Sequence, residues 1–213
     1  MKNVLCYGDS NTWGYNAETT DRFAADVRWT GVLKKIVGDD YYIIEEGLNG
    51  RTTLWDDPFM EKRNGRDYLA PCLETHRPLD LVIIMLGTND LKSIFGYSAY
   101  DIAEGAGVLA DIVLKSGSGY NGGTPKILLI SPIQVGEGIK EAEFADMFNF
   151  EKSLTTSKEF AKQFKRVAEK YGCEFMDAAE FAQATPLDQI HLDADGHQKL
   201  GVAIAEKVKE ILG

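Results

Sequence analysis

The sequence has 213 residues, which is long enough for one domain with a sizeable apolar core. Hydrophobic residues make up 44% and charged residues 26% of the chain, an ordinary balance for a soluble globular protein. The net charge of −10 makes nucleic acid and anionic membranes poor partners. The longest apolar run, residues 81–86, is too short to span a bilayer.

Cysteine usage points to a reducing compartment. Cys6, Cys72 and Cys173 are far apart, odd in number and without metal-type pairing. The first apolar run begins within a few residues of the N-terminus, which leaves no room for a signal peptide. We therefore expect a cytoplasmic location and no bound metal.

Strand-like and helix-like segments alternate along the chain. Five short apolar runs predict buried strands, at residues 4–7, 41–44, 81–86 (with Leu79 before them), 127–130 and 173–176. Helical spacing predicts helices at residues 29–37, in a short segment ending near His76, at 99–115, around Phe160 and Phe164, and at 194–212. Irregular loops are expected at residues 11–27, 56–66, 116–124 and from 132 to about 149.

This alternation is typical of the α/β class. It predicts a three-layer α/β/α sandwich around a five-stranded parallel sheet. The continuous apolar run at 81–86 indicates a central strand that is buried on both faces. No repeat or linker interrupts the pattern, so residues 1–213 are predicted to form a single domain.

Polar motifs follow three of the predicted strands, and a fourth precedes the last helix. They are Gly8-Asp9-Ser10, Asn49-Gly50, Gly87-Thr88-Asn89-Asp90 and Asp188-Gln189-Ile190-His191. The carboxyl ends of parallel strands lie at one edge of a sheet, so these distant motifs can converge there.

The residue types in these motifs suit nucleophilic catalysis. The Ser10 hydroxyl needs a base, and His191 is the one histidine with a carboxylate, Asp188, three residues before it in a short loop. An oxyanion would need preorganised donors, for which the N–H groups of Ser10 and Gly50 and the Asn89 amide are suited. Each motif alone is also explained by structure, as a turn or a helix N-cap, and only their joint occurrence favours catalysis.

Together these residues resemble the SGNH (GDSL-type) hydrolases, through Ser10, Gly50, Asn89 and His191 with Asp188. The segments at residues 26–31, 45–48, 51–53 and 81–86 are similar to the arylesterase/acyltransferase branch of that superfamily. The resemblance implies a flavodoxin-like sheet and a Ser10-His191-Asp188 esterase without metal or cofactor. It also implies small, short-chain (acetyl-type) esters as substrates, with possible transfer to alcohols, and a homo-oligomer by analogy. The branch often has a second Trp where this chain has Tyr15, which puts the acyl or alcohol pocket and such transfer in doubt.

Two alternatives stay open at this point. One is a carbohydrate acetyl esterase, and the other is a non-catalytic flavodoxin-like module that binds FMN or phosphate at the same strand ends. The residues around the nucleophile, Asn11, Trp13 and Tyr15, are candidates for the substrate pocket.

The sequence also suggests roles or positions for several other side chains. Trp55 and Phe95 are further pocket candidates, while packing is the favoured role for Trp55, as it is for Trp29. For Asp90 and Arg51 a structural role and a direct role at the site both stay open. The structural roles are bracing of the Asn89 loop by Asp90 and pairing of Arg51 with a nearby acid. His76 and His197 are expected at the surface or at helix ends.

Overall fold

The computed structural model describes all residues 1–213 and contains one five-stranded parallel sheet with the order β4-β1-β5-β6-β7. Its strands are β1 (Lys2–Gly8), β4 (Tyr41–Gly47), β5 (Leu81–Met85), β6 (Lys126–Ser131) and β7 (Glu174–Asp177). All five strands coincide with the five predicted apolar runs. The predicted fold class is confirmed.

The central strand β5 is buried on both faces, as its continuous apolar run predicted. Leu81 and Ile83 pack into the core layer on one side of the sheet, and Val82 and Ile84 pack into the layer on the other. The alternation follows from the two-residue period of a strand. We infer a single domain, because this one sheet carries both apolar layers.

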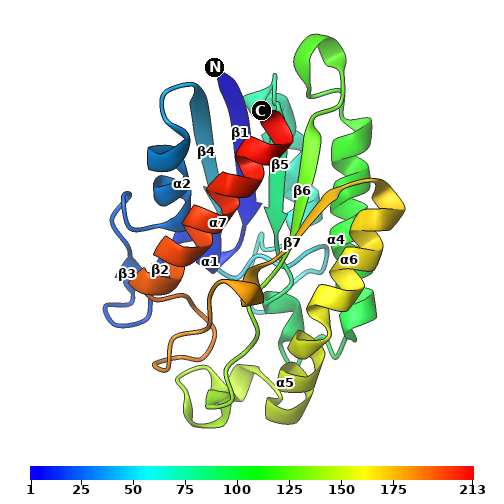
Figure 1. The fold of residues 1–213 in the computed structure, drawn as a ribbon. Helices are drawn as coiled ribbons and strands as arrows, with labels where there is room; N and C mark the ends of the chain where they lie inside the picture. The colour runs from blue at the N-terminus through cyan, green and yellow to red at the C-terminus, as the bar shows by residue number, and fades with distance from the viewer.

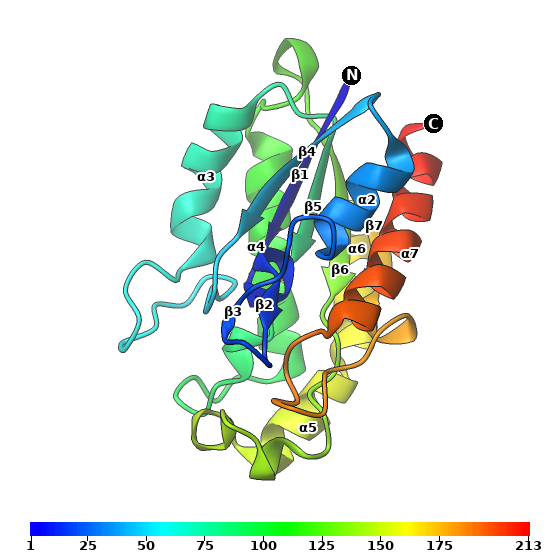
Figure 2. The ribbon, with the colours of Figure 1, turned by 90° about the vertical axis from the view of Figure 1, so that its left-hand side faces the viewer.

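Helices cover the two faces of the sheet (Figures 1 and 2). On one face lie α2 (Trp29–Val37) and α7 (Ala194–Leu212), which pack against each other. On the other face lie α3 (Gly65–His76), α4 (Ala99–Lys115) and α6 (Phe160–Tyr171). None of the helices combines the length and the apolar character that crossing a bilayer requires.

The two ends of the sheet differ in what they carry. Both termini lie at one end, where the Lys2 ammonium donates a hydrogen bond to the Leu212 carbonyl oxygen (2.6 Å). At the opposite end the chain forms the short helix α1 (Ser10–Trp13) and the small hairpin of β2 (Tyr15–Asn16) and β3 (Asp21–Arg22). The prediction of a loop throughout residues 11–27 was therefore wrong in part: the Asp9 side chain caps α1 at its start, and Gly14 ends it in the left-handed region.

The chain between β6 and β7 also differs from the prediction. It contains the 3-10 turns η3 (Ile139–Glu141) and η4 (Ala145–Met147), and then two helices where one was predicted. The first, α5 (Phe150–Lys158), is capped by Asn149, and Glu159 separates it from α6. The remaining 3-10 turns are η1 (Asn89–Leu91), η2 (Tyr120–Gly122) and η5 (Ala178–Glu180).

His197 stands at a helix end, which is one of the two predicted positions, but it is not at the surface. It lies in the first turn of α7 and is fully buried, because α7 packs this turn onto α2. Its Nδ1 accepts a hydrogen bond from the Trp29 amide (3.3 Å), and Phe23 packs edge-on against its ring. Burial lowers the pKa of His197 to about 4, so the ring is neutral near neutral pH.

Candidate active site

Ser10 begins α1, directly after β1 ends. The Asp9 carboxylate accepts a hydrogen bond from the Asn11 amide (2.9 Å), which closes the tight turn between strand and helix. This turn leaves the Ser10 hydroxyl at the carboxyl edge of the sheet, 2.8 Å from Nε2 of His191.

The segment before α7 is organised by Asp188. One carboxylate oxygen accepts hydrogen bonds from the amides of Ile190 (3.0 Å) and His191 (2.9 Å), and the other lies 2.6 Å from Nδ1 of His191. Burial by itself would raise the pKa of Asp188, but the hydrogen bonds and charge of His191 hold it below its ordinary value. Asp188 is therefore an ionised acceptor that orients the imidazole.

Asn11 connects this segment to the nucleophile. Its side-chain amide donates to the Ile190 carbonyl oxygen (3.2 Å) and accepts from the Leu192 amide (2.9 Å). Asn11 therefore holds the His191 loop against α1. The sequence had suggested Asn11 for the substrate pocket, but Asn11 is not among the residues that line the cavity beside Ser10.

Two further predicted groups lie beside Ser10. Gly50 has a φ of +80°, in the region that favours glycine, and its N–H makes no hydrogen bond within the protein. The Asn89 side-chain amide donates to the Arg51 carbonyl oxygen (3.1 Å), which sets the orientation of the amide. Both residues line the same cavity as Ser10 and His191.

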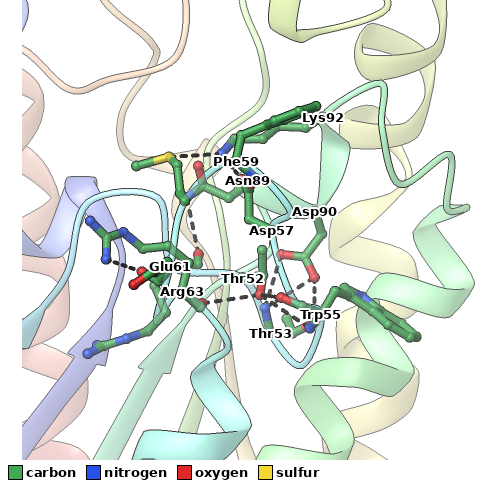
Figure 3. Close-up of polar contacts among 12 residues, drawn as sticks. Thr52, Thr53, Trp55, Asp57, Phe59, Glu61, Arg63, Asn89, Asp90 and Lys92 are labelled. Carbon is green, nitrogen blue, oxygen red and sulfur yellow. Dashed lines mark hydrogen bonds and ion pairs between the residues drawn. The ribbon is translucent and has the colours of Figure 1, made fainter.

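Asp90 follows Asn89 in the turn η1, and Figure 3 shows its carboxylate bound to Thr53. Its carboxylate accepts hydrogen bonds from the Thr53 amide (3.1 Å to each oxygen) and the Thr53 hydroxyl (2.5 Å). Burial is the main reason that the pKa of Asp90 is raised to about 7. These contacts agree with the predicted bracing role.

Arg51 does not pair with an acid, contrary to the prediction. Its buried guanidinium donates to the carbonyl oxygens of Gly8 (2.9 Å) and Glu46 and stacks 4.2 Å from the Tyr7 ring centre. Arg51 thus ties the ends of β1 and β4 to the Gly50 loop through backbone acceptors.

The cavity beside Ser10 has a volume of about 220 Å³. Its walls come from five separate segments and consist of Ser10, Tyr15, Asn49, Gly50, Met60, Asn89, Lys92, Phe144, Met147, Phe148, Ile190 and His191. A larger groove of about 590 Å³ between α6, β7 and α7 contains none of the predicted site residues.

Of the predicted aromatic pocket residues, Tyr15 lines the cavity, with its ring centre 4.5 Å from that of His191. Trp13 does not line it, because α1 turns its ring toward the Arg22 guanidinium (5.2 Å). Trp55 and Phe95 do not line it either, and instead both stack with Tyr97. Trp55 is thus a packing residue, as favoured, and so is the buried Trp29.

Five of the twelve residues that line the cavity lie outside the motifs and pocket candidates named from the sequence. Met60, Lys92, Phe144, Met147 and Phe148 lie in segments that were predicted to be irregular or were not considered. For Lys92 a signal was present, since it follows Asn89 by three residues and so lies on the same short turn.

One group of side chains could in principle ligate a metal ion. Glu46, Cys72 and His76 offer ligand atoms within 4.8 Å of one another, and none of the three lines the Ser10 cavity. Glu46 and His76 already pair with each other (2.9 Å), and burial raises the pKa of the Cys72 thiol to about 12, which disfavours the thiolate that a metal needs.

Comparison with known families agrees with this geometry. The profile of the GDSL-like Lipase/Acylhydrolase family matches residues 6–199. The chain belongs to this family. It is therefore a serine hydrolase of carboxylic esters, within the SGNH superfamily that the motifs predicted. A comparison with curated proteins gave no match.

Several solved structures are similar over the whole chain. The native aryl esterase of M. smegmatis is 42% identical, with 100% of each chain covered and a TM-score of 0.93. Est24, a carbohydrate acetylesterase from Sinorhizobium meliloti, is 41% identical with the same coverage and TM-score. A lipase/acylhydrolase from Enterococcus faecalis, at 20% identity and a TM-score of 0.70 over 99% and 96% of the two chains, shares the fold.

Proposed function

We propose that Ser10, His191 and Asp188 hydrolyse short-chain, acetyl-type esters through an acyl-enzyme. The observation that carries the proposal is the continuous hydrogen-bonded series from the Ser10 hydroxyl to His191 (2.8 Å) and from His191 to Asp188 (2.6 Å). The small cavity at Ser10 favours a short acyl group. Both relatives that are about 40% identical are named as esterases, one of aryl esters and one of carbohydrate acetates.

The first half-reaction forms the acyl-enzyme. His191 Nε2 takes the Ser10 proton as Oγ bonds to the ester carbonyl carbon, and the carbonyl electron pair moves onto the oxygen. The N–H groups of Ser10 and Gly50 and the Asn89 amide stabilise that oxyanion. When the intermediate collapses, the C–O bond to the alcohol breaks and the leaving oxygen takes the proton from His191.

The second half-reaction releases the acyl group, as the acid when water attacks and as a new ester when an alcohol attacks. Water, or an acceptor alcohol, gives its proton to His191 and attacks the acyl carbon, and Ser10 leaves with the proton returned to Oγ. Asp188 stabilises the imidazolium in both halves and keeps Nδ1 protonated. The family assignment and the hydrogen-bonded series both favour this catalytic role over a flavodoxin-like binding module.

Replacement of the nucleophile tests the proposal. Ser10→Ala should lower kcat for p-nitrophenyl acetate by about a thousandfold or more, because the attacking oxygen is absent. Ser131→Ala is a matched control, since Ser131 is a buried strand-end serine whose hydroxyl donates to Asp177 rather than to a histidine. Unchanged turnover in Ser10→Ala would refute the serine mechanism.

A homo-oligomer and a cytoplasmic location remain predictions. Apolar side chains such as Phe59 and Met147 are exposed in the segments at residues 56–66 and 132–149, which makes these segments candidates for contacts between subunits. All three cysteines are free. Size-exclusion chromatography with light scattering measures the oligomeric state.

A further inference from the structure

Lys92 contributes the amino group of a buried ion pair to the wall of the Ser10 cavity. Its side chain is 3% exposed and pairs with the equally buried Asp57, with 2.7 Å between Nζ and Oδ2. Figure 3 shows Lys92, Asp57 and Asn89 close to one another, and Lys92 and Asn89 both line the cavity. No other lysine or arginine lines the cavity.

Stability alone is a poor reason for this ion pair. Removing two charges from water costs about as much as their attraction returns, so apolar residues of similar size stabilise a buried site as well or better.

The Lys92 ammonium also does not use all of its N–H donors within the protein. Of the three N–H groups of Lys92, one meets Asp57, and the next protein contact is a weak one to the Met60 sulfur (3.7 Å). A charged donor is therefore left for a ligand in the cavity.

Asn49 supplies the complementary group. It lines the same cavity, and its side-chain oxygen is buried without a hydrogen-bond partner. A buried acceptor without a partner is costly, and a donor from a bound ligand would remove that cost. The surrounding wall is apolar at Phe144, Phe148 and Ile190, which strengthens any hydrogen bond formed there.

We propose that Lys92 and Asn49 form a subsite that binds a hydroxyl group of the ester substrate. A hydroxyl both accepts and donates, so it can accept from the Lys92 ammonium and donate to the Asn49 oxygen at the same time. The cavity volume of about 220 Å³ places this hydroxyl within a few bonds of the ester carbon. The inference rests on the proposed function of Ser10 and adds the substrate class: small esters that carry a free hydroxyl close to the ester bond.

Two pairs of probes that differ by one group test the subsite. 2-Hydroxyethyl acetate and propyl acetate differ by a hydroxyl for a methyl on the alcohol side, and ethyl glycolate and ethyl propionate differ in the same way on the acyl side. The wild-type protein should favour the hydroxyl member of at least one pair by about tenfold or more in kcat/KM, measured by acid release in a pH-stat. The pair that shows the preference identifies whether the subsite binds a hydroxyl on the alcohol side or on the acyl side of the ester.

Variants connect that preference to the two residues. Asn49→Ala should reduce the wild-type ratio by several-fold or more. The double variant Lys92→Met/Asp57→Asn removes the ammonium without leaving a buried carboxylate unpaired, and should bring the ratio close to one. Asp57→Asn alone retains the ammonium and should retain most of the preference. Because Asn49 lies in a loop, its variant keeps the test decisive even if the double variant folds poorly.

The outcomes separate the subsite from the proposed function. If the wild type hydrolyses p-nitrophenyl acetate and Ser10→Ala does not, the proposed function stands. In that case a ratio near one for both pairs, or a preference unchanged in Asn49→Ala and the double variant, overturns the subsite alone. If the wild type hydrolyses no ester, both proposals fall.

Discussion

Two regions of the site use buried aspartates in opposite ways. At the ends of β1 and β5, Asp9 and Asp90 bind backbone amides and a hydroxyl and have no cationic partner in hydrogen-bond contact. Burial raises their pKa values to about 6 and about 7. In the loop before α7, Asp188 is similarly buried but faces His191, and its pKa is lowered. A buried carboxylate thus shapes a turn when it meets only the backbone, and becomes an orienting anion when an imidazole faces it.

The largest expected effect of this difference is at Asp188. Asp188→Asn keeps the shape of the side chain but presents an amide to His191, which disfavours the tautomer that can accept the Ser10 proton. We expect kcat for p-nitrophenyl acetate to fall by about 10⁴-fold. Asp193→Asn is the control, because Asp193 caps α7 nearby and Asn caps equally well, so its turnover should not change. Equal activities in the two variants would remove Asp188 from the mechanism.

The second-largest loss of activity is expected on substitution of Asn89, whose turn Asp90 braces. Asn89→Ala removes one donor to the oxyanion, and we expect kcat to fall by about 10²- to 10³-fold with little change in KM. Steady-state kinetics with p-nitrophenyl acetate measures both constants. Asn3→Ala removes an amide that donates to the Pro78 carbonyl oxygen (2.7 Å) at the opposite end of the sheet, and it should leave kcat unchanged. A rise in KM alone would assign Asn89 to ground-state binding.

Asp90 should show its role in stability rather than in turnover. Its folded pKa of about 7 lies above the value of an unfolded Asp, so the folded state binds the proton more readily between about pH 4 and pH 7. Its contribution to the free energy of unfolding therefore falls as pH rises through that window. Asp90→Asn cannot titrate, so its stability relative to the wild type should rise with pH, by at most about 4 kcal/mol.

Urea unfolding of Asp90→Asn and the wild type at several pH values measures this difference. Asp111→Asn, at an exposed carboxylate on α4, should show no comparable trend. A constant difference between Asp90→Asn and the wild type across pH would contradict the raised pKa.

The smallest effect is expected at His197, which lies six residues after His191 but has no acid in contact with it. Its folded pKa of about 4 lies below the value of an unfolded His, so the unfolded state binds more protons between about pH 4 and pH 6.5. The free energy of unfolding of the wild type should therefore lose up to about 3 kcal/mol from this group as pH falls through that window. His197→Gln retains an acceptor for the Trp29 amide and should lack this loss, as measured by thermal unfolding against pH. The same slope in both proteins would show that His197 does not titrate there.

The sequence was sufficient for the repeating elements and for the core of the site. A strand buried on both faces must be apolar throughout, as in residues 81–86, and a parallel sheet must bring its strand ends to one edge. Ser10, Asn89 and the Asp188-His191 pair could be recognised for this reason. The short helix α1 and the break between α5 and α6 were not recognised, because each depends on a single cap or turn rather than on a repeating pattern.

The sequence by itself thus determined the α/β fold, the order of the strand-end motifs and the pairing of His191 with Asp188, since periodicity and short spacings act locally. Only the tertiary structure decided which side chains surround Ser10. Met60, Lys92 and Phe148 reach the cavity because irregular segments fold over the sheet edge, while Trp13 turns away and His197 is buried. Such placements depend on packing between segments distant in the chain, for which no local spacing provides a signal.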